Sequence, residues 1–339
     1  MPGILRGFTQ RHEAIPGNAM AKTRSERVRD ASSRDLQVRA AWHYYVEDLT
    51  QEAISRAMAV SRAKVVRLLH AAREDGLVTI RVAGKGGEQI ALERRLIDRF
   101  GLVEAIVVPA AAADEDTAAS VGQAAATYAV EHMRDGMSIG VGWGTTLDHC
   151  ARALGAQRLQ RVSVVALLGG MTHSRGVNPS AVARRMADAF GADCYQLTAP
   201  LVVADPALRS ALWAEPGLSE LRRRARRADL ALVSVGDVSE RATLFGEGLL
   251  PVAALDTLHS AGAVGDLLCH FLDADGREVD HPLREHIVAV DLDDLRQVSR
   301  IAIASGGAHK VDALAAALKA IRASALITDE AAARGLLSR

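Results

Sequence analysis

Cysteine is scarce in this chain, and its few cysteines are far apart. Three occur in 339 residues, at Cys150, Cys194 and Cys269. That number and spacing exclude a small domain stabilised by disulfides and a zinc site built from cysteine pairs. The histidines lack metal-ligand spacing as well. We therefore expect free thiols and no bound metal, as in a cytoplasmic protein.

Long apolar runs are also missing. Apolar residues make up 49% of the chain, but a run such as V-S-V-V-A-L-L-G-G-M at residues 162–171 is too short to cross a bilayer. The N-terminus has no apolar core of a signal peptide. With 24% charged residues, the composition is globular and the length suits two domains. We expect a cytoplasmic protein that does not enter membranes.

The chain has no net charge, which excludes a uniformly basic or acidic protein. It holds 41 Lys and Arg against 41 Asp and Glu. The charges are unevenly distributed, however: residues 1–82 carry 14 basic against 9 acidic side chains, and the remainder carries 27 against 32. A basic N-terminal part and an acidic remainder are typical of a protein in which only the N-terminal part contacts phosphate groups.

The N-terminal part contains two short helical patterns joined by a tight turn, in T-Q-E-A-I-S-R-A-M-A-V-S-R-A-K-V-V-R-L-L-H-A-A-R at residues 50–73. Apolar residues at helical spacing form one stripe on each helix. Ser61 is suited to cap the second helix, because its hydroxyl can accept a hydrogen bond from a free amide of the first turn. The turn position that is usually glycine is Ala59. This arrangement predicts a helix-turn-helix.

The second of these helices has a basic face. In helix-turn-helix proteins it lies in the major groove, where its first residues reach base edges and neighbouring phosphates. An alternative is an ordinary helical pair with a solvated basic face. The sequence after Gly76 favours DNA binding, because residues 77–82 alternate as a strand would and predict the winged form of the motif. We predict DNA contacts at Ser61, Arg62, Ala63, Lys64 and Arg67.

The sequence divides into four segments. A first helix is predicted at residues 36–46, with Trp42 in the core, and the glycine-rich residues 83–87 predict a linker. The predicted segments are a flexible arm at 1–34, a winged helix-turn-helix domain at 35–83, a linker and helix at 84–100, and an α/β domain at 101–339.

From residue 103 onward, short apolar strands alternate with amphipathic helices. Strands that are apolar throughout are typical of a parallel sheet covered by helices on both faces. We predict an α/β fold with a parallel sheet that helices cover on both faces. The predicted strands are at residues 105–108, 137–141, 162–168, 194–197, 230–235, 287–290, 301–304 and 326–327.

Glycine-rich sequences follow several of these strands, at the edge where open parallel sheets bind ligands. The first contains Gly142, Gly144, Thr145 and Thr146. There, glycines let the backbone approach a ligand, and amides at the start of the next helix attract an anion. The two threonines add hydroxyl donors, so this junction predicts a phosphate site.

Three further glycine-rich sequences support a ligand site. Gly169 and Gly170 form one junction, and residues 305–310 form another, in which Lys310 can pair with a phosphate. In residues 262–266, Asp266 follows two glycines and can accept hydrogen bonds from sugar hydroxyls. Each such turn also occurs without a ligand in α/β folds, but together they predict a phosphorylated or polyhydroxy ligand. The fingerprints G-x-G-x-x-G and G-x-x-x-x-G-K-[ST] are absent, and we expect no cofactor.

The span from Leu36 to about Leu337 resembles the SorC family of sugar-responsive bacterial transcriptional regulators. The resemblance rests on the helix-turn-helix sequence and on G-W-G-T-T-L, L-L-G-G-M, N-P-S-A-V-A-R-R-M-A, A-V-G-D-L-L-C-H-F-L-D-A-D-G and A-S-G-G-A-H-K-V-D-A-L-A-A-A-L. It implies a winged helix-turn-helix and a Rossmann-like effector domain, with a doubly wound parallel sheet, similar to sugar-phosphate isomerases and glucosamine-phosphate deaminases. It also implies a homotetramer on operator DNA, with a phosphorylated sugar or polyol as effector.

The resemblance also assigns roles by position. Residues 101–339 match the family's effector-binding and oligomerisation domain. Asp266 matches the acceptor for ligand hydroxyls, and Lys310 matches the lysine on the phosphate side. The threonines match the loop near the ligand, and the glycines match points of backbone approach; these are Thr145, Thr146, Gly144, Gly169 and Gly170.

The leading prediction is therefore a regulator of a carbohydrate or polyol operon, without enzyme activity. One alternative is a sugar-phosphate isomerase or aminosugar-phosphate deaminase that carries a DNA-binding head. Such an enzyme needs a general base, and Asp237, Glu247 and Asp266 are candidates, although none is flanked by a recognisable acid–base partner. A third possibility is an architectural DNA-binding protein whose pocket binds nothing.

Overall fold

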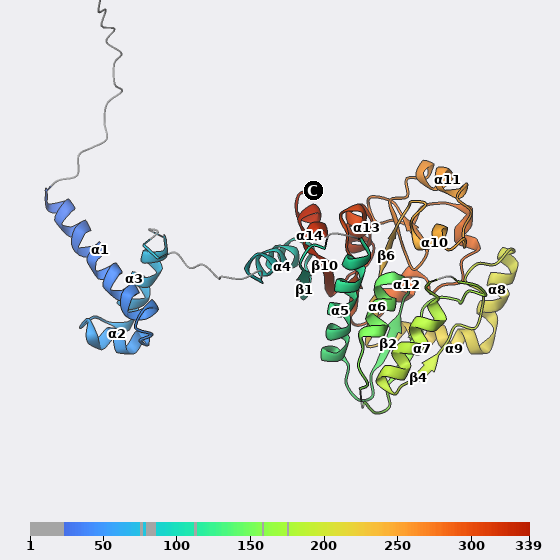
Figure 1. Cartoon of the computed structure of the whole chain (residues 1–339), viewed down its shortest axis with the longest axis horizontal. Helices are drawn as coiled ribbons and strands as arrows, with labels where there is room; N and C mark the ends of the chain where they lie inside the picture. Colours follow the sequence, from blue (N-terminus) through green and yellow to red (C-terminus); the bar gives the residue numbers. More distant parts are fainter. Residues whose placement is uncertain (1–23, 75–76, 79–85, 112–113, 158, 175) are drawn as a thin grey trace, which may run out of the picture. The chain divides into compact units, whose positions relative to one another are not determined.

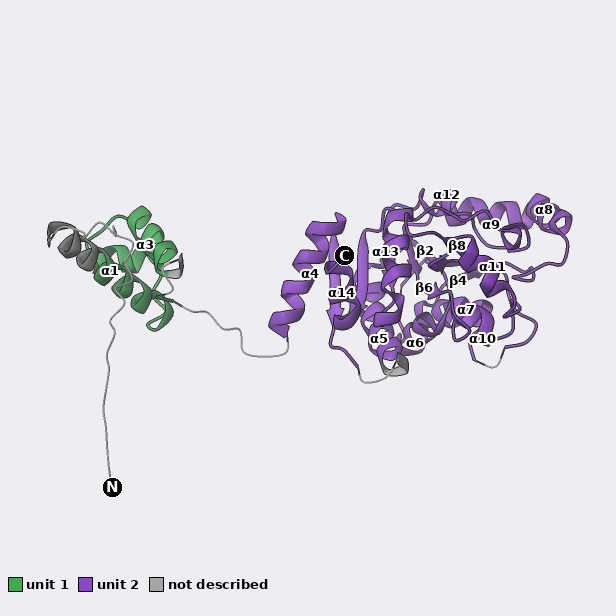
Figure 2. Ribbon diagram, turned by 90° about the horizontal axis from the view of Figure 1, so that it is seen from above, with its two compact units in different colours: residues 1–82 green, residues 83–339 purple. Residues whose placement is uncertain are grey.

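The structure is a computed structural model of the chain (Figure 1). It describes residues 24–74, 77–78, 86–111, 114–157, 159–174 and 176–339. The chain forms two compact units, Met1–Val82 and Ala83–Arg339, which Figure 2 shows in different colours. No helix within the described ranges combines the length and apolarity that crossing a membrane requires.

The first unit contains the helices α1 (Arg24–Tyr45), α2 (Gln51–Ala57) and α3 (Arg62–Glu74). Both α1 and α2 pack against α3. Thr50 caps α2, because the backbone N–H of Ala53 donates to its Oγ1 at 3.2 Å. The small core of this unit contains Ala40, Ala41, Ile54, Val65, Leu68, Leu69 and Ala72.

Two predictions for this unit are wrong. Helix α1 begins at Arg24, inside the segment predicted as a flexible arm; no glycine or proline occurs from residue 18 to residue 75, so nothing in the sequence interrupts a helix there. Trp42 was expected in the core but is 56% exposed, because α1 turns its alanines toward the other helices. Of the predicted wing strand, residues 79–82 lie outside the described residues, as do the first linker residues.

The second unit is built on a seven-stranded sheet in the order β1-β10-β9-β5-β2-β3-β4, and all neighbouring strands are parallel. Every residue of β5, β9 and β10 is buried, which shows that helices and loops cover both faces of the sheet. The predicted α/β fold class is confirmed. The strands are β1 (Glu104–Val108), β2 (Ser138–Val141), β3 (Ser163–Ala166), β4 (Asp193–Tyr195), β5 (Leu230–Val233), β9 (Ile301–Ala304) and β10 (Ala325–Asp329).

Helices α5, α6 and α7 lie side by side against the sheet (Figure 1). Helix α4 packs on β1 and α14 and buries Leu92 and Leu96 in the core of this unit. The segment predicted as a linker and helix therefore ends in a helix that belongs to the second unit. The helices are α4 (Gly86–Phe100), α5 (Asp114–His132), α6 (Thr145–Ala153), α7 (Pro179–Phe190), α8 (Pro206–Ala214), α9 (Pro216–Arg226), α10 (Thr243–Gly246), α11 (Ala254–Ser260), η1 (Pro282–Glu285), α12 (Leu292–Leu295), η2 (Ala308–Lys310), α13 (Val311–Ala320) and α14 (Glu330–Leu337).

A second, antiparallel sheet was not predicted. It contains β6 (Val235–Asp237), β7 (Gly265–Leu267) and β8 (His270–Leu272) in that order. The strand predicted at 287–290 is absent from both sheets, and this segment makes only isolated bridges to residues near β3 and α8. Strands of three residues carry too little alternation to be recognised in a sequence.

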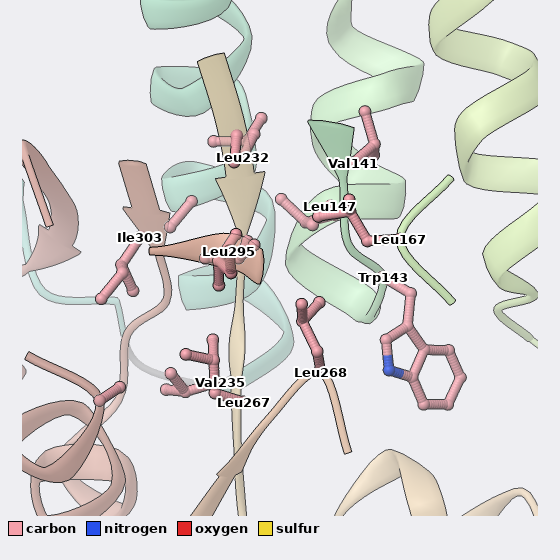
Figure 3. Close-up of a cluster of buried hydrophobic side chains, with 14 of the residues drawn as sticks. Val141, Trp143, Leu147, Leu167, Leu232, Val235, Leu267, Leu268, Leu295 and Ile303 are labelled. Atoms are coloured by element: carbon pink, nitrogen blue, oxygen red, sulfur yellow. The ribbon is translucent and has the colours of Figure 1, made fainter. Parts of the chain in front are cut away.

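Apolar side chains fill the space between the two sheets (Figure 3). Leu232 of β5 and Val235 of β6 lie in this cluster, and Leu268 enters it from the turn between β7 and β8. A Cβ atom at Gly142 would lie 3.2 Å from Leu268 Cδ2. This packing fixes the small sheet against the ends of β2 and β5.

Candidate functional site

The direction of chain progression reverses between β2 and β5, which are neighbours in the sheet. From β2 the chain continues outward to β3 and β4, whereas from β5 it continues the other way to β9 and β10. Loops after two such strands must diverge, and they leave a crevice at the carboxyl ends where α/β proteins bind ligands. The topology alone therefore marks this edge as the candidate site.

A cavity of about 730 Å³ lies at this edge. Its walls come from the loop after β2, the chain from the end of β5 to α10, the strand β7 and the loop after β9. This volume falls within the range of small-molecule sites. The lining residues are Ala118, Trp143, Gly144, Thr145, Thr146, Ser234, Val235, Gly236, Asp237, Ser239, Glu240, Arg241, Ala242, Thr243, Leu244, Asp266, Gly306, His309 and Lys310.

The structure brings five of the eight predicted ligand residues together in this cavity: Gly144, Thr145, Thr146, Asp266 and Lys310. The other three, Gly142, Gly169 and Gly170, do not line it. A Cβ at Gly169 would lie 2.7 Å from the Ala199 carbonyl oxygen, and one at Gly170 would lie 2.5 Å from Ser180 Oγ. Those glycines permit close packing of neighbouring chain segments.

Helix α6 starts at the cavity wall. Gly144 precedes it with a φ of 111°, a left-handed conformation that glycine adopts without steric cost. No side chain caps the first turn, and Thr145 and Thr146 are its first residues. The free amides and the helix dipole make this end attractive to an anion.

Asp266 lies in the middle of β7, paired with Gly236 of β6. Its Oδ2 accepts a hydrogen bond from the backbone N–H of Cys269 at 2.9 Å. Its Oδ1 lies over Gly236, where a Cβ atom would overlap it. Gly236 therefore makes the space that the Asp266 carboxyl group occupies.

Burial raises the pKa of Asp266 from its ordinary value of 3.8 to about 6. The Cys269 N–H and the positive charge of Lys310 lower this pKa, and the negative charge of Asp237 raises it further. Desolvation is the largest cause, because a buried carboxylate loses its hydration. A ligand hydroxyl that donates to this carboxylate would recover part of that loss.

The loop after β9 is held in place by Asp329 at the end of β10. Asp329 accepts from the backbone N–H of Gly307 at 2.7 Å and of Ala331 at 3.0 Å. Gly307 has a φ of 102°, and a Cβ at Gly306 would lie 2.7 Å from Asp329 Oδ1. These contacts place Lys310, at the end of η2, in the cavity wall.

The sequence did not indicate the cavity residues on the segment from Ser239 to Leu244. This segment follows β6 and has no glycine or other sequence pattern that marks a ligand loop. Of the three candidate general bases, Asp237 and Asp266 line the cavity, whereas Glu247 does not.

The predicted DNA-binding residues share one exposed surface of the first unit. Val65, Leu68 and Leu69 are buried on the opposite side of α3. The backbone N–H of Lys64 donates to Ser61 Oγ at 3.3 Å, so Ser61 caps the helix as expected. The exposed residues are Ser61, Arg62, Ala63, Lys64 and Arg67.

The turn between α2 and α3 has a left-handed residue. Ala59 has a φ of 53°, which explains why glycine is usual at this position of the motif. Ser55 Oγ donates to the carbonyl oxygen of Val60 at 2.5 Å and closes the turn from the side of α2.

Comparisons with known proteins agree with this architecture. A family model described as "Putative sugar-binding domain" matches residues 86–338. The erythritol catabolism regulatory protein EryD of Brucella abortus (strain 2308) is 32% identical over 90% of this chain and 96% of its own length. The deoxyribonucleoside regulator of Bacillus subtilis (strain 168) is 32% identical over 91% of this chain and 99% of its own length.

One solved structure is similar to this chain over most of its length. The full-length sorbitol operon regulator SorC from Klebsiella pneumoniae superposes with a TM-score of 0.70 and is 25% identical, covering 90% of this chain and 99% of that chain. This superposition agrees with the family model, which matches most of the chain. It also agrees with the two relatives, which match nearly its full length. The chain belongs to the SorC family of sugar-binding transcriptional regulators.

Proposed function

We propose that this chain regulates a carbohydrate or polyol catabolic operon, and that a phosphorylated sugar or polyol in the cavity sets its affinity for operator DNA. The observation that carries the proposal is the convergence of Thr145, Thr146, Asp266 and Lys310 from three separate loops and strands on one cavity. A phosphate suits the start of α6 and Lys310. A buried carboxylate has lost its hydration and is therefore suited to accept hydrogen bonds from sugar hydroxyls.

The relatives support this ligand class. Their names refer to erythritol catabolism, deoxyribonucleosides and the sorbitol operon, all of which concern polyhydroxy compounds. We further propose that the protein works in the cytoplasm as a homotetramer and that its role is regulatory, without catalysis. An effector acts by binding one DNA-affinity state of the tetramer more tightly than the other.

The ligand part of the proposal is tested by thermal unfolding of the full chain with a panel of phosphorylated sugars and free polyols. At saturating concentration a true effector raises the melting temperature. Lys310→Ala and Asp266→Asn are expected to remove this shift. A panel in which no compound stabilises the wild-type protein would contradict the proposal and favour an architectural DNA-binding role.

The DNA part is tested by fluorescence anisotropy with duplexes selected by the protein from a random pool. The double variant Arg62→Ala, Arg67→Ala is expected to weaken binding strongly while leaving the effector-induced thermal shift intact. Arg277→Ala is the matched control, because this exposed arginine lies in the second unit, outside the cavity. Equal DNA affinity of wild type and double variant at fixed salt would show that α3 does not read DNA.

A further inference from the structure

The cavity contains a second cationic side chain that the proposed phosphate site leaves unused. Arg241 lines the cavity from the segment between β6 and α10, four residues beyond the end of β6. It is exposed, whereas Lys310 is partly buried and close enough to Asp266 to lower its pKa. The two cations therefore reach the cavity from different segments and at different depths.

Arg241 differs from many arginines of the second unit because the described residues offer it no partner. No described carboxylate lies within 4.0 Å of its guanidinium nitrogens. By contrast, Arg222 pairs with Asp291 and Asp294, and Arg284 pairs with Glu278 at 3.3 Å. A guanidinium group in a concave site with its donors unmet is suited to bind a carboxylate or phosphate with two parallel hydrogen bonds.

The cavity is also larger than one phosphate group requires. Its volume of about 730 Å³ accommodates a sugar with charged groups at both ends. Asp237 and Asp266 supply acceptors for hydroxyl groups along the sugar. The start of α6 with Lys310 supplies one anion site, and Arg241 supplies a second cation on a different wall segment.

We propose that Arg241 selects effectors that carry a second anionic group, either a second phosphate or a carboxylate, in addition to the phosphate at Lys310. This inference rests on the proposed function, because it specifies which phosphorylated compounds the same cavity prefers. It assigns to Arg241 a role in specificity that is separate from the anchoring role of Lys310.

Two matched pairs of compounds isolate the second anion. Fructose 1,6-bisphosphate and fructose 6-phosphate differ by one phosphate, and 6-phosphogluconate and glucose 6-phosphate differ by a carboxylate. Dissociation constants are measured with the full chain by titration calorimetry or by thermal shift. We expect the wild-type protein to bind the doubly anionic member of at least one pair about tenfold more tightly, a preference of about 1.4 kcal/mol.

The variants separate the two cations. Arg241→Gln is expected to abolish the preference within the pair and to leave the affinity for the singly charged member within about twofold, since groups that share no partner contribute nearly independently. Arg241→Lys keeps the charge but loses bidentate geometry and should retain part of the preference. Lys310→Ala should weaken both members, and Arg277→Ala should change neither.

Each result decides the inference. If both members of each pair bind equally to the wild-type protein, or if Arg241→Gln weakens both members equally, Arg241 does not recognise a second anion and the inference fails while the sugar-phosphate cavity stands. If no member of either pair binds, the inference fails as stated, and the wider panel of sugars and polyols then decides whether the proposed function fails with it.

Discussion

Replacing Asp266 by asparagine is expected to stabilise the ligand-free protein and to impair effector binding. The asparagine side chain has nearly the same shape and keeps an oxygen for the Cys269 N–H, which donates to Asp266 Oδ2 at 2.9 Å. It removes the negative charge whose burial raises the pKa of this group to about 6. The variant therefore isolates the free-energy cost of the buried charge.

The magnitude follows from the difference between the two pKa values. A pKa of about 6 in the folded protein against the ordinary 3.8 is roughly 2 pH units, which corresponds to at most about 3 kcal/mol at pH 7. Because the folded-state pKa is raised, the folded protein binds the proton more tightly than the unfolded chain. Stability is consequently lost as the pH rises from about 4 to about 6, and the loss is constant above that range.

Urea unfolding of wild type and Asp266→Asn at pH 4.5 and pH 7.5, without ligand, measures this cost. The variant should be more stable at pH 7.5 by one to three kcal/mol as an order-of-magnitude estimate, and the gap should shrink at pH 4.5. Asp256→Asn, on an exposed position of α11, serves as the control and should change little at either pH. A variant that is destabilised by the same amount at both pH values would refute the reasoning.

Three further predictions follow from local geometry. Ala59→Gly should stabilise the first unit by about 0.5–1 kcal/mol in thermal unfolding, because it relieves a left-handed alanine; a loss of stability would contradict this. Gly236→Ala should displace Asp266 and weaken effector binding about tenfold or more in calorimetry, whereas Gly155→Ala, with nothing within 4 Å, should not. In the native protein, Cys194 should react with a thiol reagent before the two buried cysteines, whose pKa values burial raises; equal rates would exclude the burial assigned to them.

The sequence predicted the parts of the site that depend on local pattern. A strand, a glycine and a pair of threonines at a helix start are contiguous in the chain, so Gly144, Thr145 and Thr146 could be placed without a structure. Lys310 followed from the same pattern after β9. Much of the sheet was predictable for the same reason, since β5 and β9 are apolar throughout and β10 begins with three apolar residues.

The remainder depends on contacts between distant residues. Asp266 was predicted as a ligand residue, but its position in a strand was not. It reaches the cavity because three-residue strands pair as β6-β7-β8, and no local pattern marks such strands. Gly169 has the same local signature as Gly144, yet its neighbours are the backbone atoms of residues 199 and 200. The position of Arg241 in the cavity could not be recognised from the sequence, because its segment forms a wall of the cavity only when β5 and β2 lie side by side in the sheet.

The most direct test of the account is the operator affinity of the full chain with and without the effector found in the thermal screen. We expect a saturating effector to change this affinity by about 5-fold to 150-fold, and we expect Lys310→Ala to bind the operator as wild type does but to ignore the effector. An effector that stabilises the protein and leaves the operator affinity of the wild type unchanged would contradict the claim that cavity occupancy controls DNA binding.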